Sequence, residues 1–173
     1  YCVMGRGRNQ HHRRQEKKDE QQKSDEVPRI SFDYFFMRKE DERSSANPLI
    51  VMMDEKTGEK FARATGRKGL GENHEMDWLV KDMDSELKAW GHAGGVDGHI
   101  ILKCGGEPAI EAVRDALAKY HGGRVIPEGP PKNESQSNGR IEEAGKTVRE
   151  FVRVIKEQIE DKAQVKMECA DAL

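Results

Sequence analysis

The sequence is poor in apolar residues and cysteines, and it has no long hydrophobic run. Hydrophobic residues make up 35% of the 173 positions, so we expect a small core with loose flanks. No apolar stretch approaches the ~20 residues that cross a bilayer, so we expect no membrane span. Cys2, Cys104 and Cys169 lie far apart without a C-x-x-C pair, which argues against a disulfide scaffold and favours a reducing, intracellular compartment.

An excess of charge of one sign is also missing. Lys plus Arg total 30 and Asp plus Glu total 32, so nucleic-acid binding would have to come from local clusters. The chain starts at Tyr1 without a basic-then-apolar leader, and we expect a fragment of a longer, non-secreted protein. Residues 1–27 are polar with mixed charges, which predicts a flexible linker; contact of their arginines with phosphate is the alternative.

Order is predicted to begin at Pro28 with three strands. The apolar and aromatic runs at 29–37, 48–53 and 60–65 have strand propensity. A short turn that contains Gly58 separates the second and third runs, which favours an antiparallel hairpin.

Helices and strands are predicted to alternate over the rest of the chain. The order β-β-β-α-β-α-β-α implies an α/β fold with a five-stranded mixed sheet and helices on both faces. The predicted elements are a helix from its N-cap Asn73 to Trp90, a strand at 99–104, a helix between Pro108 and Gly122, a strand at 124–128 and a long helix from about Asn138. The stripes expected in the core are Leu79, Val80, Met83, Leu87 and Trp90; Ile110, Val113, Leu117 and Tyr120; and Ile141, Ala144, Val148, Phe151, Val152, Ile155 and Ile159.

Two groups of charged residues stand out against this framework. Asp33 lies in the middle of the apolar strand ISFDYFFM, where an uncompensated carboxylate costs several kcal/mol. It therefore needs a cation, a metal or hydrogen-bond donors, and a structural salt bridge is the simplest of these. Glu142 falls in the first turn of the last helix, with Lys146 and Arg149 on the same face. That pattern fits a metal-binding carboxylate beside phosphate-binding cations, and equally an ordinary ion-pair ladder.

Together these features resemble the catalytic core of retroviral and retrotransposon integrases, most of all the copia-like retroelement type. The resemblance covers about residues 28–164 and implies a ribonuclease H-like fold, with 1–27 left from an upstream zinc module and 165–173 a truncated tail. It is carried by Asp33 in its strand, by a later strand that ends LKCGGEP, and by the loop-and-helix pattern of Pro131, Ser137, Gly139 and Glu142.

The resemblance implies Mg²⁺-dependent (or Mn²⁺-dependent) strand transfer, which joins element DNA ends to target DNA. Two metal ions activate the attacking oxygen and stabilise the leaving one in such reactions, and carboxylates are their natural ligands. In the family pattern Asp33 bridges both ions and Glu142 completes one site. DNA contacts are expected from Asn138, Lys146, Arg149 and Arg153.

The position of the family's second acid is occupied here by Gly105. Cys104 is a soft ligand expected on the other face, Asp97 comes too early, and Glu107 reaching back is the remaining alternative. If the missing ligand removes ~4 kcal/mol of transition-state stabilisation, the rate falls about a thousandfold. We therefore expect impaired catalysis; a non-catalytic nucleic-acid-binding relic and a ribonuclease H-like nuclease are the alternatives.

The resemblance also bears on zinc, oligomers and location. Of the upstream module's four zinc ligands only Cys2 is present, and a structural zinc needs four, so no zinc site is expected. A homodimer or higher oligomer, and a place in the nucleus or in a retroelement particle, are implied by the family.

Overall fold

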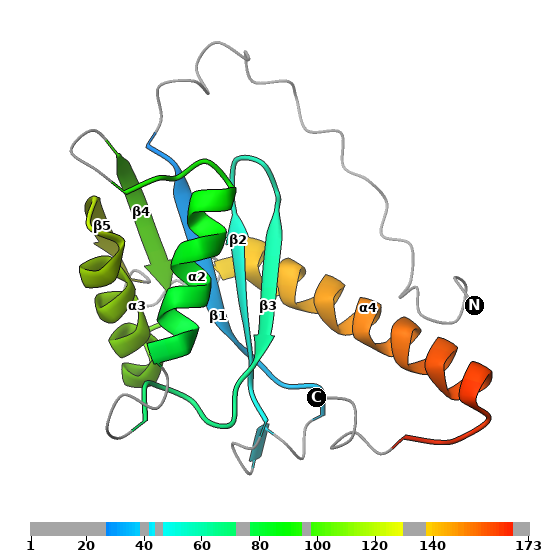
Figure 1. The fold of residues 1–173 in the computed structure, drawn as a ribbon. Helices are drawn as coiled ribbons and strands as arrows, with labels where there is room; N and C mark the ends of the chain where they lie inside the picture. The colour runs from blue at the N-terminus through cyan, green and yellow to red at the C-terminus, as the bar shows by residue number, and fades with distance from the viewer. Residues whose placement is uncertain are drawn as a thin grey trace.

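The computed structural model of the protein describes residues 27–38, 42–43, 47–71, 77–94, 98–129 and 138–167. Within these ranges the chain forms one mixed sheet with helices packed on it (Figure 1). The elements are β1 (Arg29–Phe35), β2 (Leu49–Asp54), β3 (Lys60–Ala64), α2 (Asp77–Ala89), β4 (His99–Cys104), α3 (Pro108–His121), β5 (Arg124–Glu128) and α4 (Gly139–Ala163).

The five strands lie in the order β3-β2-β1-β4-β5. The β1–β2 and β2–β3 pairs are antiparallel, whereas β1–β4 and β4–β5 are parallel. The predicted hairpin between the second and third strands is therefore confirmed, with Gly58 at φ 79° in its turn. The predicted fold class, an α/β ribonuclease H-like sheet in the order β-β-β-α-β-α-β-α, is confirmed as well.

The two faces of the sheet are covered differently. Alternate residues of β1 point to opposite faces, so Ile30, Phe32 and Tyr34 join the core under α2 and α3. The opposite face carries a smaller cluster, in which Val51 and Met53 pack against the start of α4. In Figure 1, α2 and α3 lie on one side of the sheet and α4 crosses on the other. The prediction of helices on both faces is thus confirmed.

The core stripe predicted for α3 is wrong at its last residue. Tyr120 is 50% exposed, and His121 is buried in its place. Leu117 lies one helical turn before His121, so the stripe continues at i+4 and not at i+3. His121 is accommodated because its Nδ1 lies 2.7 Å from Oδ1 of the buried Asp84 on α2.

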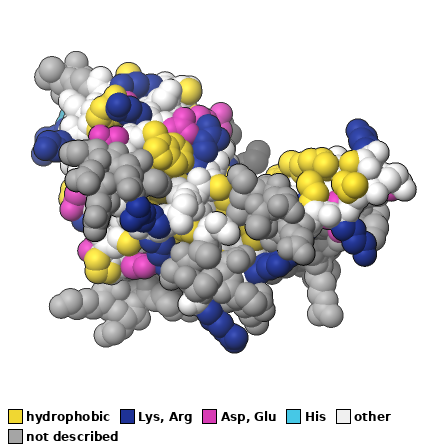
Figure 2. All heavy atoms as spheres, turned by 60° about the horizontal axis from the view of Figure 1, so that its bottom comes forward, with side chains coloured by type: hydrophobic (Ala, Val, Ile, Leu, Met, Phe, Trp, Pro, Cys, Tyr) yellow, Lys and Arg dark blue, Asp and Glu magenta, His cyan; other side chains and the backbone are white. Residues whose placement is uncertain are grey.

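The long stripe predicted for α4 is buried only at its beginning. Ile141 and Ala144 are in the core, but Phe151, Ile155 and Ile159 are exposed. The reason is length: a helix of 25 residues spans about 37 Å, whereas the six-residue strand β2 spans about 20 Å. The distal half of α4 therefore extends past the sheet, and hydrophobic side chains gather on that arm, at the right of Figure 2.

Several sequence predictions lie outside the described residues. These include Asn73 as a helix cap, the arm up to residue 26, and most of the tail after residue 167. The proposed domain boundaries at 27/28 and 164/165 therefore stay predictions.

Candidate functional site

A hollow of about 740 Å³ lies on the α4 side of the sheet, beside the end of β1. Six charged residues that carry the argument below line it: Asp33, Lys68, Glu107, Glu142, Arg149 and Arg153. They come from four segments that are far apart in the sequence. The two acids predicted from sequence, Asp33 and Glu142, thus face the same hollow.

Asp33 is the central carboxylate of the hollow. It is half-buried, and one oxygen accepts a hydrogen bond from the N–H of Tyr34 at 2.8 Å. Burial raises the pKa of Asp33, and the negative charges of Glu107 and Glu142 add to that rise, while the Tyr34 N–H and the Lys68 charge oppose it. Among the residues that the structure describes, Asp33 forms no direct salt bridge, so the simplest sequence interpretation is not supported there.

Gly105 lies directly against Asp33. The parallel register of β1 and β4 pairs Phe32 with Cys104, which brings the next residues, Asp33 and Gly105, side by side. A Cβ atom at Gly105 would lie 3.0 Å from Oδ2 of Asp33 and 3.3 Å from Oδ1. Gly105 is not among the glycines with positive φ, so its backbone accepts a side chain without strain. Gly105, the predicted position of the missing second acid, is therefore adjacent to Asp33, the predicted first acid.

The predicted DNA-contacting residues on α4 are only partly brought together. Arg149 and Arg153 line the hollow, and the Arg149 guanidinium lies 5.8 Å from the centre of the Phe35 ring. Lys146 is exposed and is not part of the lining, and Asn138 occupies the N-cap of α4 without a side-chain capping bond.

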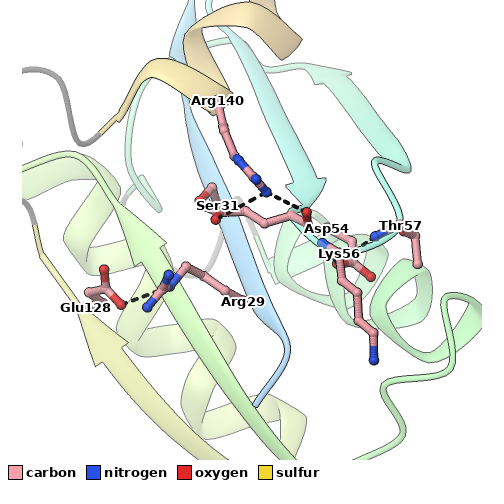
Figure 3. A network of polar contacts seen from close by, with 8 residues as sticks. Arg29, Ser31, Asp54, Lys56, Thr57, Glu128 and Arg140 are labelled. Carbon is pink, nitrogen blue, oxygen red and sulfur yellow. Dashed lines mark hydrogen bonds and ion pairs between the residues drawn. The ribbon is translucent and has the colours of Figure 1, made fainter. Parts of the chain in front are cut away.

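The start of α4 is held close to the sheet by two contacts that the sequence analysis missed. A Cβ at Gly145 would lie 2.3 Å from the Phe35 ring, so only glycine allows this approach. Arg140 donates a hydrogen bond of 2.6 Å to the carbonyl of Glu55 (Figure 3). A glycine inside a helical pattern was the available signal for the first contact. The second contact joins residues 85 positions apart, and no local pattern marks it.

Lys68 is the functional candidate that sequence reasoning overlooked. Its ammonium lies 2.7 Å and 3.0 Å from the two carboxylate oxygens of Glu107. It also lies 5.2 Å from the centre of the Phe36 ring and 5.8 Å from that of Tyr34. Glu107, considered from the sequence as a replacement ligand, is thus already occupied by a cation.

The donor set does not fit a site for two metal ions. Within the described ranges, no three His, Cys, Asp or Glu residues lie close enough together to hold one. Cys104 packs on the α2/α3 face, as expected, and burial raises the pKa of its thiol to about 11. Asp33 and Glu142, the two predicted acids, face the hollow together with Glu42, and we derive no metal-dependent step from them.

Other predicted motif residues cannot be placed. Cys2, Asp97, Pro131 and Ser137 lie outside the described residues. The helices that the structure does describe include none that is long and apolar enough to cross a membrane.

Comparison with known proteins finds likenesses in structure but none in sequence. No protein-family model matches the sequence, and no curated protein is significantly similar to it. The fold is similar to a chain in the cryo-EM structure of the simian T-cell lymphotropic virus intasome in complex with PP2A regulatory subunit B56 gamma, with 14% identity and a TM-score of 0.35. The match covers 71% of this chain and 47% of that one, so it spans less than half of the viral chain's length.

Proposed function

We propose that this protein is the core domain of a retroelement integrase that binds DNA and whose strand-transfer activity is impaired. One observation carries the proposal: the glycine that replaces the family's second acid lies against the first acid, with a Cβ position 3.0 Å from Oδ2 of Asp33. This adjacency is what the family pattern predicts for its first and second acids.

The position of Glu142 supports the same conclusion. It enters the hollow from the first turn of α4, whereas Asp33 enters from the middle of β1. The two acids are 109 positions apart in sequence, yet the charge of one raises the pKa of the other. In the proposed function, these two carboxylates are what remains of the metal-binding acids, with Mg²⁺ or Mn²⁺ held weakly.

DNA is the proposed partner because cations border the acids. Arg149 and Arg153 face the hollow, and Lys146 lies exposed on the same helix. Phosphate contacts of this kind give salt-dependent binding with little sequence preference. Element ends and target DNA are the proposed substrates, the nucleus or a retroelement particle the proposed location, and a homodimer or higher oligomer the proposed assembly.

Restoring the acid tests the proposal most directly. In Gly105→Asp the new carboxylate joins Asp33 and Glu142, and Asp33 has to shift by a few tenths of an ångström to make room. We expect Mn²⁺-dependent joining of short duplex ends to rise by about a hundredfold to a thousandfold over wild type. The measurement is a strand-transfer assay with labelled duplex DNA.

Gly105→Asn is the matched control, because it has the same shape without the charge and should stay inactive.

DNA binding is measured on the same proteins by fluorescence anisotropy. Between about 50 and 200 mM salt the affinity should fall steeply, and Arg149→Ala with Arg153→Ala should lower the salt slope by about one unit per lost phosphate contact. Binding without salt dependence would contradict the DNA proposal. Binding with no activity from Gly105→Asp would favour the non-catalytic relic.

A further inference from the structure

The Lys68 ammonium occupies the part of the hollow next to the acids. Both oxygens of Glu107 lie within 3.0 Å of it, and the Lys68 side chain is only 23% exposed. Its positive charge also acts on Asp33, where it opposes the effects of Glu107 and Glu142. Lys68 therefore binds the Glu107 carboxylate directly and also acts on the charge of Asp33.

Lys68 is fixed in this position by its surroundings and is not a loose surface side chain. The neighbouring Gly69 has φ 81° and donates its N–H to the buried Tyr34 hydroxyl at 2.9 Å. The Lys68 ammonium itself lies over the Phe36 and Tyr34 rings. The Gly69–Tyr34 hydrogen bond and the two aromatic rings hold the Lys68 side chain in the position where it contacts Glu107.

We propose that Lys68 is the resident cation of this site and that its ammonium excludes a divalent metal ion from the carboxylates. A hard cation such as Mg²⁺ or Mn²⁺ needs carboxylate oxygens that are free to coordinate it. Glu107 is the one acid near Asp33 that comes from the segment of the missing ligand, and Lys68 covers both of its oxygens. Among the described residues no three possible ligands lie close enough to hold a metal ion, and Glu107 is the one that Lys68 already binds.

This inference rests on the proposed function only in taking the hollow as a site for metal and phosphate. It makes a separate claim, namely that the loss of the metal site has two causes in this chain. The glycine removes one ligand, and the lysine blocks a substitute. Removing Lys68 should then free the Glu107 carboxylate to turn towards Asp33, and it should raise the affinity for Mn²⁺ without any change at Gly105.

The test is Mn²⁺ binding in the absence of DNA, followed by electron paramagnetic resonance of the free ion. Lys68→Met keeps the aliphatic stem over the rings and removes the charge. We expect it to bind Mn²⁺ at least about tenfold more tightly than wild type. Lys68→Arg, which keeps a cation, should resemble wild type. If the methionine variant fails to fold, judged by its thermal melt, Lys68→Gln takes its place.

Two further variants separate a new site from a general change of charge. Lys60→Met removes an exposed lysine that donates to the Gly58 carbonyl and is not part of the lining, so Mn²⁺ affinity should not change. Adding Glu107→Gln to Lys68→Met should abolish the gain. Equal affinity of Lys68→Met and wild type would overturn the inference, as would an equal gain in Lys60→Met. A gain in Lys68→Met together with absent DNA binding would instead refute only the proposed function.

Discussion

The two faces of the sheet differ in what they bury, and the difference separates the apolar core from the candidate site. The face under α2 and α3 holds a continuous apolar core that includes fully buried Phe32, Leu79 and Leu102. The face under α4 has four buried apolar residues in its cluster and then opens into the charged hollow. One strand, β1, supplies both faces, because its residues alternate between them.

The same contrast appears in two aspartates. Asp54, at the end of β2, is fully buried, and it receives hydrogen bonds from the Lys56 N–H at 2.7 Å and from His92 at 3.0 Å. Burial alone would raise the pKa of Asp54, but these bonds and a longer one from Thr57 hold it below its usual value. The pKa of Asp33 is shifted upward, since burial and two like charges outweigh its single hydrogen bond and the charge of Lys68. The fold thus stabilises the ionised form of Asp54 and destabilises that of Asp33.

The largest expected effect comes from the core under α2 and α3. Phe32 has no exposed surface, so Phe32→Ala should lower the free energy of unfolding by about 3–5 kcal/mol. That is a large part of the roughly 5–15 kcal/mol by which such a domain is stable. Urea unfolding followed by circular dichroism measures the loss.

Ile155 provides the matched comparison on the distal half of α4. It is 53% exposed, and Ile155→Ala should change the same quantity by no more than about 0.5 kcal/mol. Similar losses in the two variants would show that the distal half of α4 is packed in solution and would erase the contrast between the faces.

A smaller effect is expected from Asp54. Because its pKa is lower in the folded protein, its contribution to stability is present above the ordinary value of 3.8 and is lost as pH falls through the folded value. Asp54→Asn should cost roughly 1.5–3 kcal/mol at pH 7, since it weakens hydrogen bonds to a buried charge, and should flatten the acid limb of the stability curve. Unfolding in urea at a series of pH values provides the measurement. His92→Gln, which keeps a donor, should retain most of that acid dependence; a curve as flat as that of the asparagine variant would assign the effect to His92.

The sequence was enough to predict the sheet but not the full site. Strand alternation and helix periodicity depend on local residue types, and they predicted the strands and helices of the described residues in the right order. Gly105 could be singled out because the LKCGGEP motif around it is local, and its role as a lost metal ligand stays a prediction. Lys68 could not be predicted as a site residue. Its partner Glu107 lies 39 positions away, and the position of the Lys68 side chain depends on the Tyr34 and Phe36 rings. The exposed half of α4 was missed for a related reason: an apolar stripe says which side of a helix is hydrophobic, but not how far the sheet extends beneath it.

The smallest expected effect concerns Asp33 and has the opposite sign to that of Asp54. Because folding raises the pKa of Asp33, its ionised carboxylate destabilises the native state at pH values above the folded pKa. This destabilisation is lost as the pH falls through the folded pKa towards 3.8. Asp33→Asn keeps an oxygen for the Tyr34 N–H and removes the charge, so it should increase the free energy of unfolding at pH 7 by roughly 0.5–1 kcal/mol. The gain should shrink in acid, whereas the exposed Glu143→Gln on α4 should show none at any pH. A loss of stability in Asp33→Asn would mean that the charge supports the fold, and Asp33 would then belong with Asp54 as a structural acid.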